Sequence, residues 1–154
     1  VSPAEICNSA IGFSRILVSK YTDRFEYQLD ADTPEVYVVR GLIEQAIVNL
    51  LKNACEALPD RKRRIRLESS YDAASTSVVI SVADEGRGIP EEVLSTLGDA
   101  FVGDRAAEGG TGLGVSIVQT ILEKHGGAVR FHKSEEFATI ARMHLPLSGP
   151  QAEP

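Results

Sequence analysis

The chain has 154 residues, of which 43% are apolar and 25% are charged, and its formal net charge is −6. This length and composition fit one soluble globular domain with a single core, and they exclude disordered and fibrous proteins. The acidic balance argues against general attraction to nucleic acid or to an anionic membrane, so a polyanionic ligand would need local donors or a metal ion. No apolar run approaches the roughly 20 residues that span a bilayer.

Cysteine and histidine give no sign of a metal cluster or a redox motif. Cys7 and Cys55 lie in helical patterns among apolar residues, so we expect two reduced core thiols rather than a disulfide. Neither a C-x-x-C motif nor a Cys–His cluster occurs in the sequence. His125, His132 and His144 are scattered, and each is expected at the surface or on a strand face.

The first segment has the pattern of an amphipathic helix. Ser2-Pro3-Ala4-Glu5 combines a serine cap, proline in the first turn and glutamate three residues after the cap, which is typical of a helix start. An apolar stripe then continues to about Tyr21. Its members, all expected to face the core, are Ile6, Ala10, Phe13, Ile16 and Leu17.

Strand and helix patterns alternate after this helix. Phe25, Tyr27 and Leu29 alternate with polar residues and predict a half-buried strand, and the short apolar run at 35–39 predicts another. Residues 41–58 return to helical spacing. The remaining elements are expected, in order, as strands at 64–72 and 77–84, a short helix at 91–97, a loop at 98–110, a helix at 111–125, and strands at 128–134 and 138–147.

This order of elements predicts an α+β fold, with helices on one face of a largely antiparallel sheet. Gly126 is the expected C-terminal stop of the last helix. We expect one domain at residues 1–147 and a disordered tail at 148–154. The fold class alone says nothing about chemistry, which has to come from particular residues.

The helix at 41–58 carries two asparagines at the border of its apolar face. Asn49 and Asn53 are four residues apart, so they stack on one flank of the helix. Asparagine is a mediocre helix former, because its side chain competes for backbone groups. The pair has two interpretations. Both residues are surface or capping amides, or one is a neutral oxygen ligand for a hard cation such as Mg²⁺ and the other is a polar group beside it.

The strand at 77–84 ends on Asp84 and turns through Gly86 and Gly88. An aspartate at the end of a buried strand is costly unless something donates to it. One interpretation is a turn that ends the strand and carries acidic side chains with no binding role. The other is a carboxylate that accepts from an exocyclic amine such as that of adenine, and that rejects the carbonyl which guanine presents at the same place.

The last helix is preceded by "EGGTGLGV", in which four of eight residues are glycine. Glycines at a helix start let backbone N–H groups converge on an anion, helped by the positive end of the helix dipole. The stretch is not a Walker-type loop, because G-x-x-x-x-G-K-[ST] is absent from the sequence. A phosphate role is therefore suggested, although the motif by itself is weak.

The combination and spacing of these features resemble the GHKL ATPase superfamily, and within it the ATP-binding catalytic domain of bacterial sensor histidine kinases. "NLLKNACEAL" resembles its N box, "DEGRGIP" its G1 box, "DAFVGDR" its F box and "GTGLGVSIVQTILEKHGG" its G2 box. The resemblance covers roughly residues 36–147. It implies the Bergerat fold, a two-layer α/β sandwich whose mixed, mostly antiparallel sheet has helices on one face.

The resemblance also implies a site for ATP and Mg²⁺. Asn53 would coordinate Mg²⁺, Asp84 would bind the adenine amine, and Asn49 and Arg105 would be the catalytic residues. Asn49 stands where gyrase-type relatives have a water-activating glutamate, which favours phosphoryl transfer over hydrolysis. The full set expected to bind ATP is Asn49, Lys52, Asn53, Asp84, Gly86, Gly88, Ile89, Phe101, Arg105, Gly110, Thr111, Gly112, Leu113 and Gly114.

One position departs from the family pattern. Many family members carry Lys or Arg three residues after the metal-binding asparagine, and this chain has Glu56 there. The resemblance therefore leaves open which cation contacts the phosphates, with Lys52 and Arg105 as the candidates. Arg105 falls where the F box often has lysine, so it is the preferred contact of the γ-phosphate.

The function implied is the catalytic domain of a two-component sensor histidine kinase. Its phosphoacceptor histidine would lie in a separate dimerisation domain, because none of the three histidines has the setting of a dimeric helical hairpin. We expect this domain to bind nucleotide and to phosphorylate itself poorly alone. The alternative is a stand-alone serine kinase of the anti-sigma-factor type, which shares the fold and typically has glutamate in place of Asn49.

The partners implied are ATP and ADP, the histidine-bearing dimerisation domain and a cognate response regulator. No nucleic acid and no membrane contact is expected of this domain. The resemblance implies a cytoplasmic location, whether or not the parent protein is anchored in the inner membrane.

Overall fold

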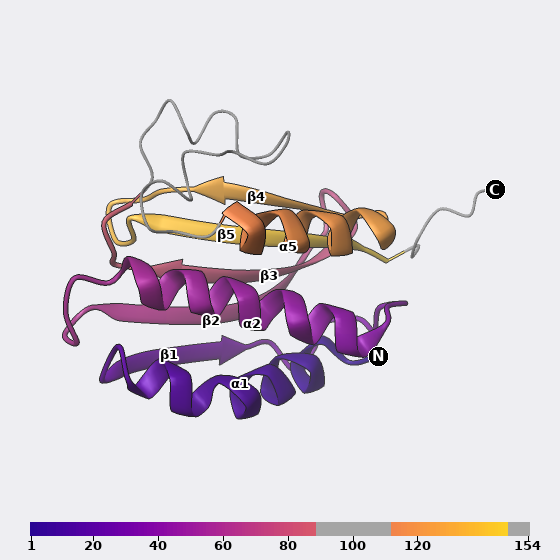
Figure 1. Cartoon of the computed structure of the whole chain (residues 1–154). Coiled ribbons are helices and arrows are strands. Elements are labelled where there is room, and N and C mark those ends of the chain that lie inside the picture. The colour runs from indigo at the N-terminus through magenta and orange to yellow at the C-terminus, as the bar shows by residue number, and fades with distance from the viewer. Residues whose placement is uncertain (89–111, 148–154) are drawn as a thin grey trace.

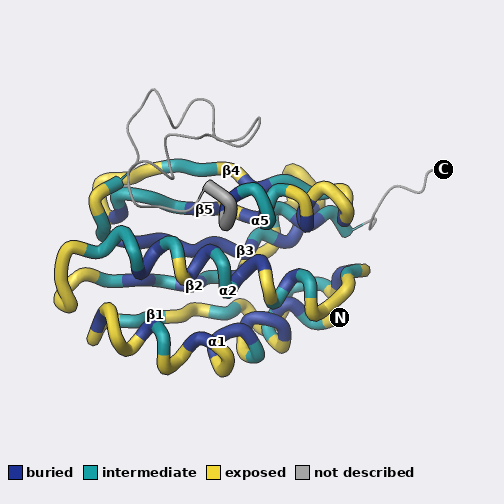
Figure 2. The backbone as a smooth tube through the Cα atoms, viewed as in Figure 1, coloured by how far each residue is buried: buried dark blue, intermediate teal, exposed yellow. Residues whose placement is uncertain are grey.

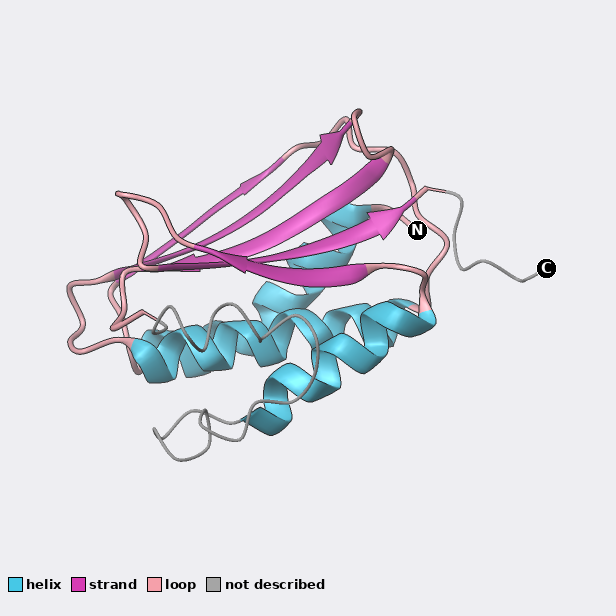
Figure 3. Cartoon of the chain, turned by 90° about the horizontal axis from the view of Figure 1, so that it is seen from above, coloured by secondary structure: helices cyan, strands magenta, loops and turns pink. Residues whose placement is uncertain are grey.

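The computed structural model describes residues 1–88 and 112–147, which form two layers. Within this part of the chain, the helices α1 (Pro3–Ser19), α2 (Arg40–Ala57) and α5 (Gly112–Lys124) cover one face of a five-stranded sheet, and no helix covers the other face (Figures 1 and 3). The strands are β1 (Arg24–Leu29), β2 (Arg64–Asp72), β3 (Ser77–Asp84), β4 (Ala128–His132) and β5 (Thr139–Pro146). The predicted α+β sandwich is confirmed.

The sheet has the strand order β1-β2-β3-β5-β4. β1 pairs with β2 in parallel, and all other neighbours are antiparallel. The parallel pair requires a crossover, and α2 supplies it. β3 lies in the middle of the sheet and is buried along nearly its whole length. Figure 2 shows the buried residues of this strand in dark blue. Its last residue, Asp84, is 4% exposed.

The helix ends follow the sequence signals. The Glu5 backbone N–H donates to Ser2 Oγ at 3.4 Å, as the predicted cap of α1 requires. After α5, Gly126 has φ of 74°, and the Gly127 N–H donates to the Leu122 carbonyl at 2.8 Å. This pattern is a glycine-dependent helix stop. α2 is different, because no side chain caps its first turn.

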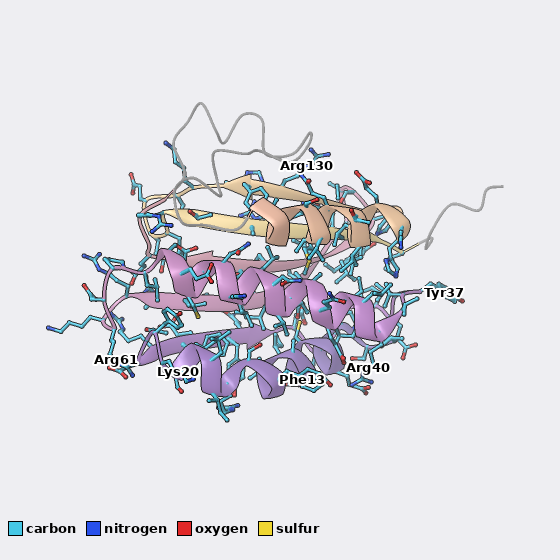
Figure 4. All side chains as sticks on the ribbon, in the orientation of Figure 1. Phe13, Lys20, Tyr37, Arg40, Arg61 and Arg130 are labelled. Carbon is cyan, nitrogen blue, oxygen red and sulfur yellow. The ribbon has the colours of Figure 1, made fainter. Side chains whose placement is uncertain are left out.

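Two of the residues predicted to face the core from α1 are at the surface instead. Phe13, labelled in Figure 4, is 72% exposed. Ile16 is 75% exposed. The core-facing side of α1 passes through Ile6, Cys7 and Ala10. Nine residues at about 100° each place Ile16 on the side opposite Cys7. The apolar stripe predicted from the sequence is therefore wider than the face of α1 that α2 and the sheet cover.

Two strand predictions in the same region were also wrong. Tyr27 is 51% exposed, because β1 is an edge strand and only Phe25 and Leu29 pack against the core. Residues 35–39 form no strand. Their only ladder-like partner among the described residues is Val1, whose backbone exchanges two hydrogen bonds with Val36, at 2.9 and 3.0 Å. The segment is held at Val36 and, through the Val39 N–H, by His125 Nε2, and it leads into α2.

The cysteine prediction is confirmed, since Cys7 and Cys55 are both free and buried. Burial raises the pKa of the Cys7 thiol to about 12, so it stays protonated and unreactive at neutral pH. In the described part of the chain, every helix is too short or too polar to span a membrane.

His132 and His144 lie on strand faces as predicted, and they should make stability depend on pH. Burial, followed by the charges of nearby arginines, lowers the pKa of each from 6.5. The folded state therefore binds fewer protons than the unfolded state, and its stability is complete above pH 6.5 and falls as the pH is lowered through the folded pKa. Urea unfolding between pH 8 and 5 should show this loss. In the double variant His132→Gln, His144→Gln the free energy of unfolding should depend less on pH. An unchanged slope would contradict the prediction.

Candidate functional site

Asp84 is a buried acid at the end of the central strand. Its side chain is 4% exposed, and its Oδ1 atom accepts from the Gly86 backbone N–H at 2.8 Å. An ionised carboxylate offers about four acceptor positions, and the bond from Gly86 fixes the orientation of this one. β3 fixes the backbone of Asp84 between Ile65 of β2 and Thr139 of β5. The carboxylate is thus held rigidly beside the end of α2.

The turn after Asp84 is packed directly against the end of α2. The Arg87 N–H donates to the carbonyl of Ala57 at 3.1 Å. A Cβ added to Gly86 would lie 2.6 Å from Asp84 Oδ1 and 2.7 Å from the Ala57 carbonyl oxygen. Gly88 has φ of 79°, a conformation that favours glycine. Both glycines that the sequence analysis assigned to the site are therefore required by the backbone geometry.

Gly86→Ala should destabilise the protein, because neither the strand end nor the helix end has room to move. We expect a loss of about 1–3 kcal/mol in the free energy of unfolding, the usual cost of overpacking. Gly12→Ala is the matched control, since Gly12 lies in α1 and a Cβ there would meet nothing within 4 Å. That control should stabilise by up to about 1 kcal/mol. Equal effects in urea unfolding would contradict the close packing at Gly86.

The turn is also clamped on the uncovered side of the sheet, by residues that the sequence analysis did not select. Glu85 Oε1 accepts from the Arg64 backbone N–H at 2.6 Å, and Glu85 Oε2 lies 3.0 Å from the Arg64 guanidinium. Burial alone would raise the pKa of Glu85, but these hydrogen bonds outweigh it and the pKa is lowered. Arg64 in turn stacks on the Phe137 ring at 4.8 Å. The clamp keeps the turn, and with it Asp84, in place.

α2 forms the wall that faces Asp84. Of the three polar residues predicted on α2 to bind ATP, one lines the pocket and two do not. Asn53 lines the pocket together with Leu50, Ala54 and Ala57. Asn49 is half-buried one turn earlier and is not among the described residues that line this pocket. Lys52 is exposed on the outer side of the helix and does not line it either. The structure thus brings Asn53 and Asp84 together and leaves Asn49 and Lys52 farther from the carboxylate.

Between these walls lies a pocket of about 510 Å³, including its open mouth. Its floor is the apolar surface of the sheet, and its polar groups converge from α2 and from the turn after β3. This combination of an apolar floor and a few polar groups is typical of a small-molecule site. The described residues lining it are Leu50, Asn53, Ala54, Glu56, Ala57, Val82, Asp84, Arg87, Gly88, Phe131, Thr139 and Ala141.

The lining includes residues that the sequence analysis did not assign to the site, among them Phe131, Thr139 and Arg87. Phe131 and Thr139 come from β4 and β5, and Arg87 lies within the predicted G1 box without having been selected. Thr139 is the cross-strand partner of Asp84. That pairing joins positions 55 apart in the chain, so only the sheet register reveals it.

Two acids, Glu56 and Asp84, line this pocket together with Arg87. Glu56 Oε1 is buried and has no hydrogen-bond partner, and Asp84 lies in the same lining. Burial, and then the charges of Glu56 and Asp84, raise the pKa of the neighbouring Cys55 thiol to about 12. An amide oxygen and carboxylate oxygens are the ligands that Mg²⁺ prefers. The donors present here therefore fit a Mg²⁺ ion brought in with a phosphate ligand.

Part of the predicted site lies outside the described residues. These positions are Ile89, Phe101, Arg105, Gly110 and Thr111, together with the predicted helix at 91–97, the loop at 98–110 and the tail at 148–154. α5 begins at Gly112, so the backbone of Gly112, Leu113 and Gly114 forms its first turn. The prediction that glycines open this helix is confirmed, while their contact with phosphate stays a prediction.

Comparison with known proteins identifies the family. The family described as "Histidine kinase-, DNA gyrase B-, and HSP90-like ATPase" matches residues 39–149. The chain belongs to this ATPase family. The matched range begins at the start of α2 and includes the whole pocket, and it confirms the family suggested by the four sequence boxes.

Curated relatives within this ATPase family include nitrogen-regulation sensor proteins. The chain is 36% identical over 137 residues to nitrogen regulation protein NtrY of Azorhizobium caulinodans, which covers 84% of the chain and 18% of NtrY. It is 35% identical over 136 residues to the sensory histidine kinase/phosphatase NtrB of Azospirillum brasilense, covering 80% of the chain and 33% of NtrB. The chain therefore spans a third or less of the length of these relatives.

Solved structures of ATPase-family domains have the same fold. The catalytic domain of histidine kinase ThkA, in a nucleotide-free form, superimposes with a TM-score of 0.79 at 26% identity, covering 96% of this chain and 93% of that one. ThkA has also been solved in complex with the response regulator protein TrrA, and there the TM-score is 0.75 at 26% identity, covering 96% of this chain and 41% of that one.

Proposed function

We propose that this chain is the ATP-binding catalytic domain of a sensor histidine kinase, with residues 1–147 as the functional unit. The observation that carries the proposal is the position of Asp84 and Asn53 on facing walls of one pocket, inside the range that matches the ATPase family. NtrB of Azospirillum brasilense is named a sensory histidine kinase/phosphatase and ThkA a histidine kinase, which favours this function over the serine-kinase alternative.

The base of the nucleotide would lie against the turn after β3. Asp84 would accept a hydrogen bond from the exocyclic amine of adenine, while its other bond to Gly86 holds the carboxylate still. Because Gly86 has no side chain, the turn packs directly against Ala57 and Asp84, which keeps the carboxylate at the wall of the pocket. The apolar floor, which includes Val82 and Ala141, would pack on the ring. Adenine is preferred to guanine because an ionised carboxylate cannot donate to a carbonyl.

The phosphates would extend from this base towards the start of α5. Asn53 would hold Mg²⁺ through its amide oxygen, and the Glu56 carboxylate, which lines the same pocket, would add negative charge beside it. When bound, Mg²⁺ supplies charge neutralisation for the transferring phosphoryl group. The first-turn N–H groups of α5 and the predicted contact from Arg105 would complete the anion site. This chain would therefore act by positioning and electrostatics.

The phosphoacceptor and downstream partners would come from outside this domain. A histidine on a dimerisation domain would attack the γ-phosphorus as its bond to the ADP oxygen breaks. A response regulator would then receive the phosphoryl group, a proposal supported by the ThkA–TrrA complex of a similar chain. These reactions would take place in the cytoplasm.

The test is incubation of this chain with γ-labelled ATP, Mg²⁺ and a separately made helical hairpin bearing the acceptor histidine of an NtrB-type kinase. The proposal predicts label on the hairpin that acid removes and alkali does not. Acid-stable label on a serine of a partner protein would favour the alternative. Saturable binding of a fluorescent ATP analogue, without any transfer, would limit the function to nucleotide binding.

A further inference from the structure

His125 is a buried titratable residue that the nucleotide site does not use. Its side chain is 4% exposed, which contradicts the surface position expected from sequence. The Nδ1 atom is 2.7 Å from the Ile121 carbonyl oxygen, and the Nε2 atom is 3.0 Å from the Val39 backbone nitrogen. A carbonyl only accepts and an amide N–H only donates, so Nδ1 carries the proton and Nε2 accepts. The imidazole is therefore neutral, in one tautomer.

These two hydrogen bonds connect two helices. Ile121 is in the last turn of α5, and Val39 is the residue that precedes α2 as its N-cap. No side chain caps the first turn of α2. The Val39 N–H donates instead to the imidazole of a residue 86 positions away. α5 and α2 run side by side in opposite directions (Figure 1).

The bond to Val39 is separable from the end of α5 itself. α5 is already closed by the Gly127 N–H, which donates to the Leu122 carbonyl at 2.8 Å. Gly127 is fixed there, because a Cβ on it would lie 2.0 Å from the His144 carbonyl oxygen. What the imidazole adds is the connection to α2.

We propose that His125 is a positioning residue that fixes the placement of α5 along α2. Asn53 lies near the far end of α2, and Gly112 begins α5. α2 and α5 are continuous helices that pack against each other, so a bond that joins them at one end constrains the separation of these residues at the other. The consequence for nucleotide binding rests on the proposed function, whereas the helix placement does not.

Two substitutions separate the hydrogen bonds of His125. Asparagine has its amide at the distance of Nδ1 along the side chain, so His125→Asn keeps a donor for Ile121 and loses the bond to Val39. Glutamine has its amide at the distance of Nε2, so His125→Gln can accept from Val39 again. Lys124→Gln, at an exposed neighbouring position, is the control. Variants are compared only where circular dichroism shows a folded protein.

The placement of the helices is measured by the distance between spin labels at Gln45→Cys in α2 and Thr120→Cys in α5, both exposed positions. The native thiols, Cys7 and Cys55, are buried with pKa values raised to about 12, so labelling is confined to the new sites. We expect a narrow distance distribution in the parent, in His125→Gln and in Lys124→Gln. His125→Asn should broaden or shift it, and an unchanged distribution would overturn the proposal.

The consequence for the site is measured by titration with a fluorescent ATP analogue and Mg²⁺. Loss of one buried hydrogen bond is expected to raise Kd about fivefold in His125→Asn, with recovery in His125→Gln. A folded His125→Asn protein that shows the altered distance and binds with the parent Kd would overturn the positioning role. If the parent itself does not bind, the proposed function fails, and the spin-label distances still decide whether His125 places α5.

Discussion

Asp84→Asn is expected to weaken binding of ATP by about 10- to 100-fold, the value of a charge-assisted hydrogen bond that is lost or reversed. The asparagine oxygen can still accept from the Gly86 N–H, so the turn should keep its shape. What changes is the second partner, because an amide can donate as well as accept. Discrimination between ATP and GTP should therefore become smaller as the affinity for ATP falls.

The measurement is competition of ATP and GTP against a fluorescent nucleotide, with parent and variant compared at equal fractions folded. Asp72→Asn is a matched control, because Asp72 also ends a strand and caps its own turn, through bonds to Ala74 and Ser75, far from the pocket. It should leave both affinities unchanged. Unaltered ATP affinity in Asp84→Asn would refute the assignment of this carboxylate to adenine.

Asn53→Ala is expected to remove most of the effect of Mg²⁺ on nucleotide affinity while adenosine binding is retained. Asn53 presents its amide to the pocket beside the unpartnered Glu56 oxygen, and the alanine variant leaves only the acid there. Without the neutral oxygen ligand, the ion would be held more weakly. The Kd for ATP should then be nearly the same with and without Mg²⁺.

The control for this variant is Asn8→Ala, an exposed asparagine on α1 outside the pocket, which should retain the full Mg²⁺ effect. Asn49→Ala separates the two amides of α2. It should weaken binding and keep the Mg²⁺ response, because Asn49 does not line the described pocket. A normal Mg²⁺ response in Asn53→Ala would remove this residue from the metal site.

Much of the fold was predictable, because its strongest local signals agree with the tertiary structure. The strands at 64–72 and 77–84 were placed to the residue, since apolar alternation and a polar turn both mark them. The start of α1 and the stop after α5 were marked by capping residues, whose bonds are local. Such features need no knowledge of the rest of the chain.

The errors arise where the outcome depends on which surface another element covers. Phe13 and Ile16 fit helical spacing, but spacing does not say how wide the covered face is. Residues 35–39 have strand-forming side chains and no neighbouring strand to pair with. His125 was expected at the surface, because its partner Val39 lies 86 positions earlier in the chain.

The candidate site was predictable in its residue types and less so in its geometry. Four residues were selected from their spacing. The structure places Asn53, Asp84 and Gly88 in the lining of one pocket, and Gly86 packs against Asp84 and Ala57. The requirement for glycine at Gly86 comes from its contact with Ala57, which the sequence does not show. The role of Glu56 was unresolved for a similar reason, since an unpartnered acid becomes meaningful only once its burial is known.

A crystal structure of this chain with a non-hydrolysable ATP analogue and Mg²⁺ tests the central claim most directly. The account predicts the adenine amine within hydrogen-bond distance of an Asp84 carboxylate oxygen, and the Asn53 amide oxygen on the metal. A nucleotide bound elsewhere, or one that touches neither Asp84 nor Asn53, would contradict it.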